Sequence, residues 1–498
     1  MRLSRITKIS PRGRAVLALV LQGAVCAVAL MLLSVTAAEL PRPYALSVAL
    51  AGLLAWSIGS WKLAGRNLFD PYCIFLIAAF LFNAGHGLLE VIGSNDLGIV
   101  SGAFSESVVR QTLMVSFAGL AGLHLGALLA VSLGSDRVGQ LRWPSEDREI
   151  WVRRIGWVLL FIALPAAGIW LTQTLSIVSA TGYASLYDRE LGAGIAATPF
   201  VLSGLLVPAA LFLTASSGRH KFDRRVATTV IVSLAIIQFY IGYRSTAAMP
   251  LIAWMWLHHK LVKPVRWSAI LVWSLVLVFV VFPLVRETRN MSSDERSTES
   301  YWSTFASVDN PAISSVHEMG ATMGTTAHTL TLVPSSRPFD NGVGYAYALL
   351  TLFPNLFWDI HPTIVRGTAN DWLVRSINPW LAARGGAYGY SCIAEAYLNF
   401  GNAGVIPMLA IYGILLVALV IWGEKSGDPA KLAVVATILA FTLRFPRDEL
   451  AGVIRPVVWY AVVPYLCTIV IPVIAGGALK TRSVRLNRPV GRVRPGAA

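Results

Sequence analysis

Apolar stretches long enough to cross a bilayer as helices divide most of this chain. About 20 apolar residues cover the roughly 30 Å of bilayer hydrocarbon as a helix, and lipid accepts only helices or closed barrels because every backbone polar group must be paired. Only 13% of the residues are charged, against roughly a quarter in soluble domains. We therefore predict an all-α polytopic membrane protein with about 12 transmembrane helices, in a range of 11 to 13. The predicted spans are 15–38, 44–61, 71–92, 108–133, 155–180, 195–215, 226–242, 245–259, 267–285, 390–422, 432–445 and 456–477.

The distribution of charge predicts the orientation of these spans. With the N-terminus inside, the cytoplasmic segments hold 27 of the 41 Lys and Arg residues but only 8 of the 26 Asp and Glu residues. Cytoplasmic loops of membrane proteins carry such an excess of Lys and Arg. Both termini are therefore predicted to be cytoplasmic. The same bias accounts for the net charge of +15, so the sequence indicates a lipid bilayer as partner and no nucleic acid.

The segment between Arg225 and Lys260 decides whether the number of spans is even. Its 34 residues are too many for one untilted span and too few for two full spans with a loop. A single crossing would place the basic segments that follow on the outer side, against the charge rule. We therefore predict two short helices that meet at "GYRS", with Arg244 at or just below the outer surface.

The predicted spans form two groups, which one large outer loop separates. The predicted parts are 1–285, an N-terminal bundle of about nine spans; 286–388, a large outer loop with short helices; 389–478, three C-terminal spans; and 479–498, a basic cytoplasmic tail that we expect to be disordered. This loop is the largest predicted segment outside the membrane.

Four arginines lie at or just below the predicted outer face, where Lys and Arg are otherwise sparse: Arg244, Arg444, Arg447 and Arg455. An arginine in hydrocarbon costs at least about 2.5–3.5 kcal/mol, so such residues usually have a partner or a function. Guanidinium groups bind phosphate oxygens in a bidentate manner and stay charged. The four converge on an anionic ligand if the seventh, eighth, eleventh and twelfth spans pack together. In the alternative interpretation they interact with a helix dipole, pair with Asp448 and Glu449, or extend to the interface.

Three residues are candidates for acid–base catalysis. Glu395 lies in "GYSCIAEAYLNFGNAG", in the first turns of a span that follows the large loop, and His317 and Glu318 lie together in "SSVHEMGATMG". A carboxylate or histidine at such a place suits a general base. Alternatively, Glu395 neutralises an arginine beside a close helix contact at Gly401 and Gly404, and His317 is a solvated or packing residue. Since no HxxxH, HExxH, DxD or CxxC pattern is present, we predict no metal site and no cofactor.

These patterns together resemble the Wzy-type O-antigen or oligosaccharide repeat-unit polymerases. The resemblance covers the number of spans, the large outer loop before the last three spans, and four patterns in order: "GYRSTA" at 242–247, "HEMGATMGTTAHTL…VP" at 317–334, "GYSCIAEAYLNFGNAG" at 389–404 and "RFPRDEL" at 444–450. It implies a metal-independent glycosyltransferase of the bacterial inner membrane, with the large loop in the periplasm and undecaprenyl-pyrophosphate-linked oligosaccharide as both donor and acceptor. Whether a chain-length regulator also binds stays open.

The resemblance also implies roles for the candidate residues. The four arginines would neutralise the pyrophosphate leaving group, and Glu395, Glu318 or His317 would take the acceptor proton. Two alternatives remain. An O-antigen ligase or another lipid-sugar-dependent glycosyltransferase shares this architecture, and His317 and His361 suit the histidine and arginine pairs expected in a ligase. A lipid-linked sugar flippase or transporter is less well supported, because no internal repeat is detectable and the charges lie at one face.

Overall fold

The structure is a computed structural model that describes residues 10–134, 146–186, 198–218, 220–291, 297–307, 310–355 and 358–474. Within these ranges every regular element is a helix, and eleven helices are long and apolar enough to cross a membrane. The prediction of an all-α polytopic membrane protein is therefore confirmed, and these eleven candidate spans fall within the predicted range of 11 to 13. The predicted basic tail, 479–498, lies outside the described residues.

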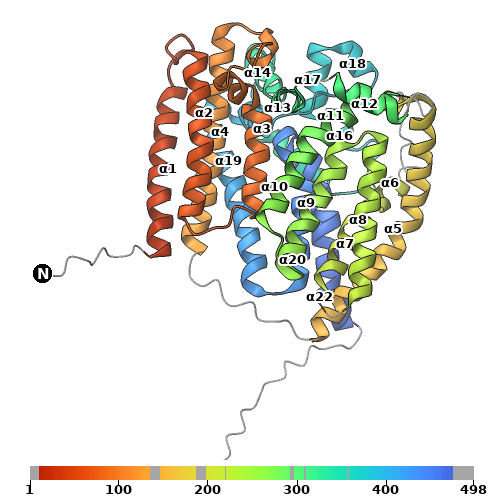
Figure 1. The fold of residues 1–498 in the computed structure, drawn as a ribbon. Helices are drawn as coiled ribbons and strands as arrows, with labels where there is room; N and C mark the ends of the chain where they lie inside the picture. The colour runs from red at the N-terminus through yellow and green to blue at the C-terminus, as the bar shows by residue number, and fades with distance from the viewer. Residues whose placement is uncertain are drawn as a thin grey trace, which may run out of the picture.

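Five long helices form one half of the molecule (Figure 1). They are α1 (Pro11–Leu33), α2 (Pro43–Leu63), α3 (Pro71–Val91), α4 (Glu106–Gly134) and α19 (Cys392–Ser426). Helix α4 is the most deeply buried of them and packs closely against α19. Glycines permit this approach, because small residues let helix backbones meet within a membrane. A Cβ atom on Gly126 would stand 1.9 Å from the carbonyl oxygen of Ala410, and one on Gly413 would stand 2.1 Å from that of Leu123.

The contact between α4 and α19 predicts a large difference between two glycine-to-alanine variants. We expect Gly126→Ala to lower the free energy of unfolding by about 3 kcal/mol or more, because the added methyl group overlaps backbone that must move away. Gly52→Ala on α2 is the matched control, since a Cβ there meets nothing within 4 Å. Thermal unfolding in detergent, followed by the loss of monodisperse protein, measures both variants. Equal midpoints would show that α4 and α19 do not pack in this way.

The second half consists of the helices on the right of Figure 1, together with the C-terminal helices. They are α5 (Glu146–Thr181), α6 (Thr198–Ser203), α7 (Leu206–Ala215), α8 (Lys221–Ile241), α9 (Arg244–Leu261), α20 (Pro429–Thr442), α21 (Leu450–Val457) and α22 (Val463–Ile474). The predicted break at "GYRS" is confirmed. Gly242 ends α8 in the left-handed conformation, with φ of 111°, and this conformation is readily available only to glycine.

Helix α9 runs from the large loop to the opposite end of the helical bundle, although it is not among the eleven candidate spans. At its first residue, Arg244 pairs with Glu318 of the large loop. Near its other end, Lys260 pairs with Glu424 at 2.7 Å, and Glu424 also pairs with Arg66 at the junction of α2 and α3. The two ends of α9 therefore lie at opposite faces, as the prediction of a second crossing in this segment requires.

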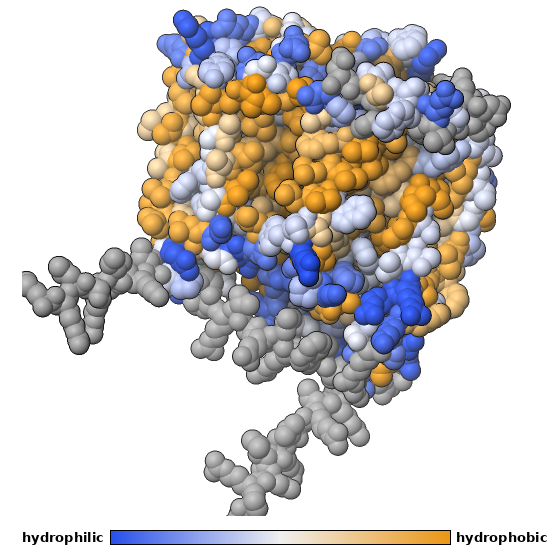
Figure 2. Space-filling model, in the orientation of Figure 1, coloured by the Kyte–Doolittle hydropathy of each residue, from blue (hydrophilic) through white to orange (hydrophobic). Residues whose placement is uncertain are grey.

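The next span and the large loop complete the molecule. The span comprises α10 (Trp267–Val276), a π-helical turn (Leu277–Val281) and α11 (Phe282–Thr288). The loop holds short helices, as predicted: α12 (Thr298–Ala306), α13 (Pro311–Gly320), α14 (Met323–Leu332), α15 (Val343–Leu350), α16 (Pro362–Arg366), α17 (Ala369–Ile377) and α18 (Pro379–Ala383). They gather at the end of the molecule opposite the first turn of α1 (Figure 1). A broad apolar band separates this polar end from the other polar end (Figure 2).

Candidate active site

A cavity of about 1890 Å³ extends from the large loop into the membrane-spanning region. Its loop end is lined by charged side chains of α9, α13, α19 and the turn after α20. Its other part is an apolar slot between α3, α9 and α10, lined by residues that include Phe69, Ile77, Phe82, Ile252, Met255, Trp267 and Leu271. The rings of Phe69 and Trp267 pack edge to face, 6.3 Å apart, near the face opposite the loop. The slot therefore runs most of the length of α9.

Arg244 holds its position through a carboxylate of the large loop. Its two terminal nitrogens donate to the two carboxylate oxygens of Glu318, with Nη1 2.6 Å from Oε2. Burial would raise the pKa of Glu318, but the hydrogen bonds and charge of Arg244, with the charges of Arg286 and Arg447, outweigh it and lower that pKa. Glu318 is thus an ionised partner of Arg244, and we expect it to position this arginine and not to accept a proton.

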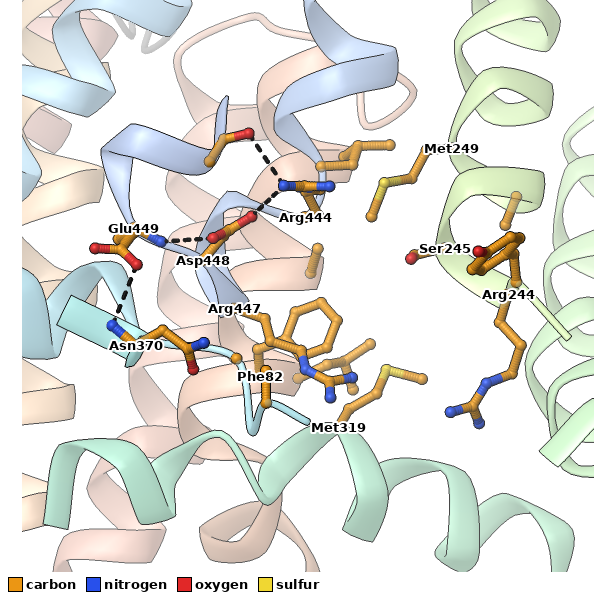
Figure 3. Close-up of a pocket in the computed structure, with 18 of the residues that line it drawn as sticks. Phe82, Arg244, Ser245, Met249, Met319, Asn370, Arg444, Arg447, Asp448 and Glu449 are labelled. Carbon is orange, nitrogen blue, oxygen red and sulfur yellow. Dashed lines mark hydrogen bonds and ion pairs between the residues drawn. The ribbon is translucent and has the colours of Figure 1, made fainter. Parts of the chain in front are cut away.

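The turn "RFPRDEL" directs Arg447 into the same space. Pro446 follows the last turn of α20, and the chain makes a short 3₁₀ turn that ends at Arg447. Gly389, with φ of 80°, lies against the Arg447 side chain, and a Cβ on this glycine would stand 3.1 Å from the Arg447 Cγ. Figure 3 shows the guanidinium groups of Arg447 and Arg244 extending into one space from opposite walls, with Met319 beside them.

The two arginines of this turn differ in their partners. Arg444 donates to the carbonyl oxygen of Gly452 at 3.0 Å and pairs with Asp448 at 2.7 Å (Figure 3). The guanidinium group of Arg447 forms no hydrogen bond or ion pair within the part of the chain that the structure describes. Its N–H donors are therefore available to an anionic ligand in the cavity.

Two of the predicted site residues do not line the cavity. Arg455 is exposed, and its guanidinium lies over the ring of Trp459, 5.4 Å from the centroid. His317 stacks on His86 with centroids 4.4 Å apart, and its carbonyl oxygen accepts from His86 Nε2 at 2.9 Å. His317 thus joins α13 to α3. Of the four predicted arginines, the structure brings Arg244, Arg444 and Arg447 to one cavity.

Glu395 lies at the wall of the cavity, in the first turn of α19. Ser391 caps this helix by accepting from the N–H groups of Ile393 and Ala394. The Glu395 side chain is buried and accepts from the backbone N–H of Leu450 at 2.9 Å. It forms no ion pair with a described arginine, so the alternative in which it neutralises one is not observed.

The glycine pair below Glu395 has a different role from the predicted helix contact. Gly401 bends α19, with φ of 63° inside the helix. The bend frees the carbonyl oxygens of Leu398 and Asn399, which accept from the N–H groups of Asp340 and Asn341 at 3.0 and 2.9 Å. The large loop is thereby attached to α19 one turn beyond Glu395.

Glu449 connects two parts of the site, a role that the sequence did not reveal. Its carboxylate accepts from the N–H groups of Ala369 and Asn370, at 2.7 and 3.2 Å, at the start of α17. A carboxylate is favourable at a helix N-terminus. Because Glu449 follows Asp448, this contact joins the arginine turn to the large loop. The partner lies 80 residues away in the sequence, so no local pattern could have revealed it.

The burial of Glu449 predicts a pH-dependent stability. Burial raises the pKa of Glu449 to about 7, whereas an unfolded glutamate has a pKa of about 4.3. Between these values the native state keeps a proton that the unfolded state has lost, so stability decreases as pH rises from about 4.5 to 7. Across this window the free energy of unfolding of the natural protein should fall by roughly 3 kcal/mol at most, relative to that of Glu449→Gln. We expect its thermal midpoint to fall accordingly, whereas that of Glu449→Gln lacks this change. Parallel pH profiles of the two proteins would contradict this.

One family model matches nearly the whole chain. It is described as O-antigen polysaccharide polymerase Wzy and matches residues 25–475. The curated proteins and the solved structures contain no significant match. All the residues that line the cavity fall within the matched range.

Proposed function

Because the chain belongs to the O-antigen polysaccharide polymerase Wzy family, we propose that its cavity is the active site in which lipid-linked oligosaccharide repeat units are joined, at the periplasmic face of the inner membrane. The observation that carries this proposal is the continuity of one cavity, whose apolar slot leads to Arg244, Arg444 and Arg447. An undecaprenyl-pyrophosphate-linked sugar has the same sequence of parts, namely an apolar chain, a doubly charged head and a polar glycan.

We assign the slot to the polyprenyl chain and the arginines to the pyrophosphate. Arg447 is the principal donor in this proposal, because its guanidinium is not used by any described residue. Arg244 and Arg444 place two further guanidinium groups near the ligand, while Glu318 and Asp448 fix their orientation. Guanidinium groups that face the site where negative charge develops stabilise a leaving group without reorganisation during the reaction.

The reaction transfers the growing chain to the incoming repeat unit. A hydroxyl oxygen of the incoming unit attacks the anomeric carbon of the growing chain and forms the new glycosidic bond. The bond between that carbon and the phosphate oxygen breaks, and its electron pair leaves with the lipid pyrophosphate. Glu395 accepts the hydroxyl proton in this proposal, since it is the candidate base that both lines the cavity and has no arginine partner.

The structure gives less support to the alternatives. The ligase interpretation rests on histidines of the large loop, but neither His317 nor His361 lines the cavity. His361 instead caps α16, where its Nδ1 accepts from the backbone N–H of Thr363 at 3.3 Å. A transporter should carry its charged residues near the middle of the membrane. Here the charged residues lie at the loop end of the cavity and the remaining walls are apolar.

Reconstitution tests the proposed activity. The purified protein in liposomes, supplied with lipid-linked repeat units from its host, should produce a ladder of longer glycans without an ion gradient. Unchanged single repeats, with correctly matched substrate and correctly folded protein, would contradict polymerase activity. Deletion in the host separates the remaining classes: accumulated single repeats attached to lipid A indicate a polymerase, and long chains not attached to lipid A indicate a ligase. Dialysis against a chelator tests the predicted metal independence in the same assay.

A further inference from the structure

We propose that the cavity holds a second oxyanion site, formed by Arg337 and Arg366, that binds an acidic group on the sugars beside the new glycosidic bond. The proposal rests on the proposed polymerase function and specifies its substrate further, as a repeat unit with an acidic sugar. Both arginines line the cavity, and the mechanism above uses neither of them.

The two arginines share a single carboxylate. Nη2 of Arg337 lies 2.8 and 3.0 Å from the two oxygens of Asp340, and Nη2 of Arg366 lies 2.5 Å from one of them. Two guanidinium charges against one carboxylate leave a net positive charge. All three side chains are largely buried, with exposed fractions of 21%, 24% and 11%. A positive charge is therefore held where little water can screen it.

Aromatic rings fix the orientation of both guanidinium groups. Arg337 lies over Trp372, 4.5 Å from the ring centroid, and Arg366 lies over Tyr347, 4.7 Å from the centroid. Stacking on an aromatic face holds a guanidinium plane without using its N–H donors. Each guanidinium donates to Asp340 through Nη2 alone, and neither guanidinium makes another hydrogen bond to a described residue. Their remaining N–H groups can therefore bind an oxyanion.

The position of this pair relative to Glu395 identifies the source of the anion. The N–H of Asp340 donates to the carbonyl oxygen of Leu398, which follows Glu395 by three residues in α19. Asp340, the carboxylate that the two arginines share, is thus attached to α19 about one helical turn beyond the proposed base. The attacking hydroxyl of the incoming unit must lie next to Glu395, which accepts its proton in the proposed reaction. The pyrophosphate of the incoming unit is at the opposite end of its oligosaccharide, so we assign the site to a sugar carboxylate near the reacting hydroxyl.

Two further arginines add positive charge at exposed positions of the cavity lining. Arg375 and Arg384 are exposed, and both belong to the lining of the cavity. Arg384 lies over Trp380, 4.1 Å from its centroid. The charges of Arg375 and Arg384 attract an anionic glycan before it reaches Arg337 and Arg366, which then bind it.

Binding of small probes to the purified protein tests the proposal. The probes are trigalacturonate, neutral maltotriose of the same length and inorganic pyrophosphate, each measured by calorimetry. We expect the natural protein to prefer trigalacturonate over maltotriose by at least about tenfold, from one or two charge-assisted hydrogen bonds. Arg366→Gln should remove this preference and leave pyrophosphate affinity unchanged. Arg447→Gln should weaken pyrophosphate binding and leave the preference for trigalacturonate unchanged.

A second variant keeps the test decisive if Arg366→Gln does not fold. Asp340→Asn removes the shared negative charge but keeps the backbone contact to Leu398, so it should tighten trigalacturonate binding several-fold. A purely structural role of the arginine pair predicts no such gain. The proposal is overturned if no variant changes trigalacturonate affinity, or if Arg366→Gln weakens pyrophosphate binding instead, which would identify a second pyrophosphate site. Trigalacturonate preference without polymerisation would retain this site and refute the proposed function.

Discussion

Replacement of Arg447 by lysine is expected to lower turnover by a hundredfold or more, while the protein still folds and inserts. Loss of one preorganised donor to a developing anion typically costs about 10²–10³ in kcat. Lysine keeps the charge but offers a point-like ammonium in place of the planar fork, so it cannot bind two oxygens in the same geometry. Polymerisation of lipid-linked repeat units by reconstituted protein measures the effect.

The sequence itself provides the matched control for this variant. Arg455→Lys changes the same residue type eight positions later, on an exposed side chain that lies over Trp459 and not in the cavity. We expect its glycan ladder to match that of the natural protein. If both lysine variants retain normal polymer length, Arg447 does not stabilise the leaving group, and the pyrophosphate site lies elsewhere.

The arrangement of spans follows from properties that each short segment carries by itself. Apolar length and the excess of Lys and Arg at one face are visible without knowledge of packing. The break at Gly242 is visible for the same reason, because a segment of 34 residues must turn back and glycine is the residue that permits the turn. The apolar helical spans and the break at Gly242 were therefore predicted correctly. On which side of the membrane the large loop lies remains a prediction from the charges.

The composition of the site depends on contacts that no segment carries alone. Arg444, Arg447 and Arg455 are close in sequence, yet Arg455 faces away from the cavity, because it lies on α21 and the packing of that helix sets its direction. Gly401 and Gly404 suggested a helix contact, but Gly401 supplies a bend instead. A glycine allows either close approach or positive φ, and only the surrounding structure decides between them. The pairing of Arg337 and Arg366 through Asp340 likewise required the folded loop.

Removal of the proposed base gives the second large effect. We expect Glu395→Gln to lower kcat by about 10²–10⁴, the usual contribution of a positioned general base. Glutamine is close in shape, and its carbonyl oxygen can still accept from the Leu450 N–H that Glu395 binds at 2.9 Å. Folding and the fixed position of the side chain should therefore survive, while the ability to take a proton is lost. Substrate binding should change little, so the loss should appear in kcat and not in KM.

The same assay distinguishes Glu395 from the other two candidates for the base. Glu318→Gln removes the ionised partner of Arg244, so we expect it to raise KM by disturbing the pyrophosphate site. His317→Ala should have a small effect on kcat, because His317 does not line the cavity and the hydrogen bond that joins α13 to α3 uses its backbone carbonyl. If Glu395→Gln retains kcat while Glu318→Gln or His317→Ala loses it, the proton is accepted on the α13 side of the cavity. The hydroxyl would then approach from the opposite wall, and the Arg337 and Arg366 site would no longer lie beside the reacting sugar.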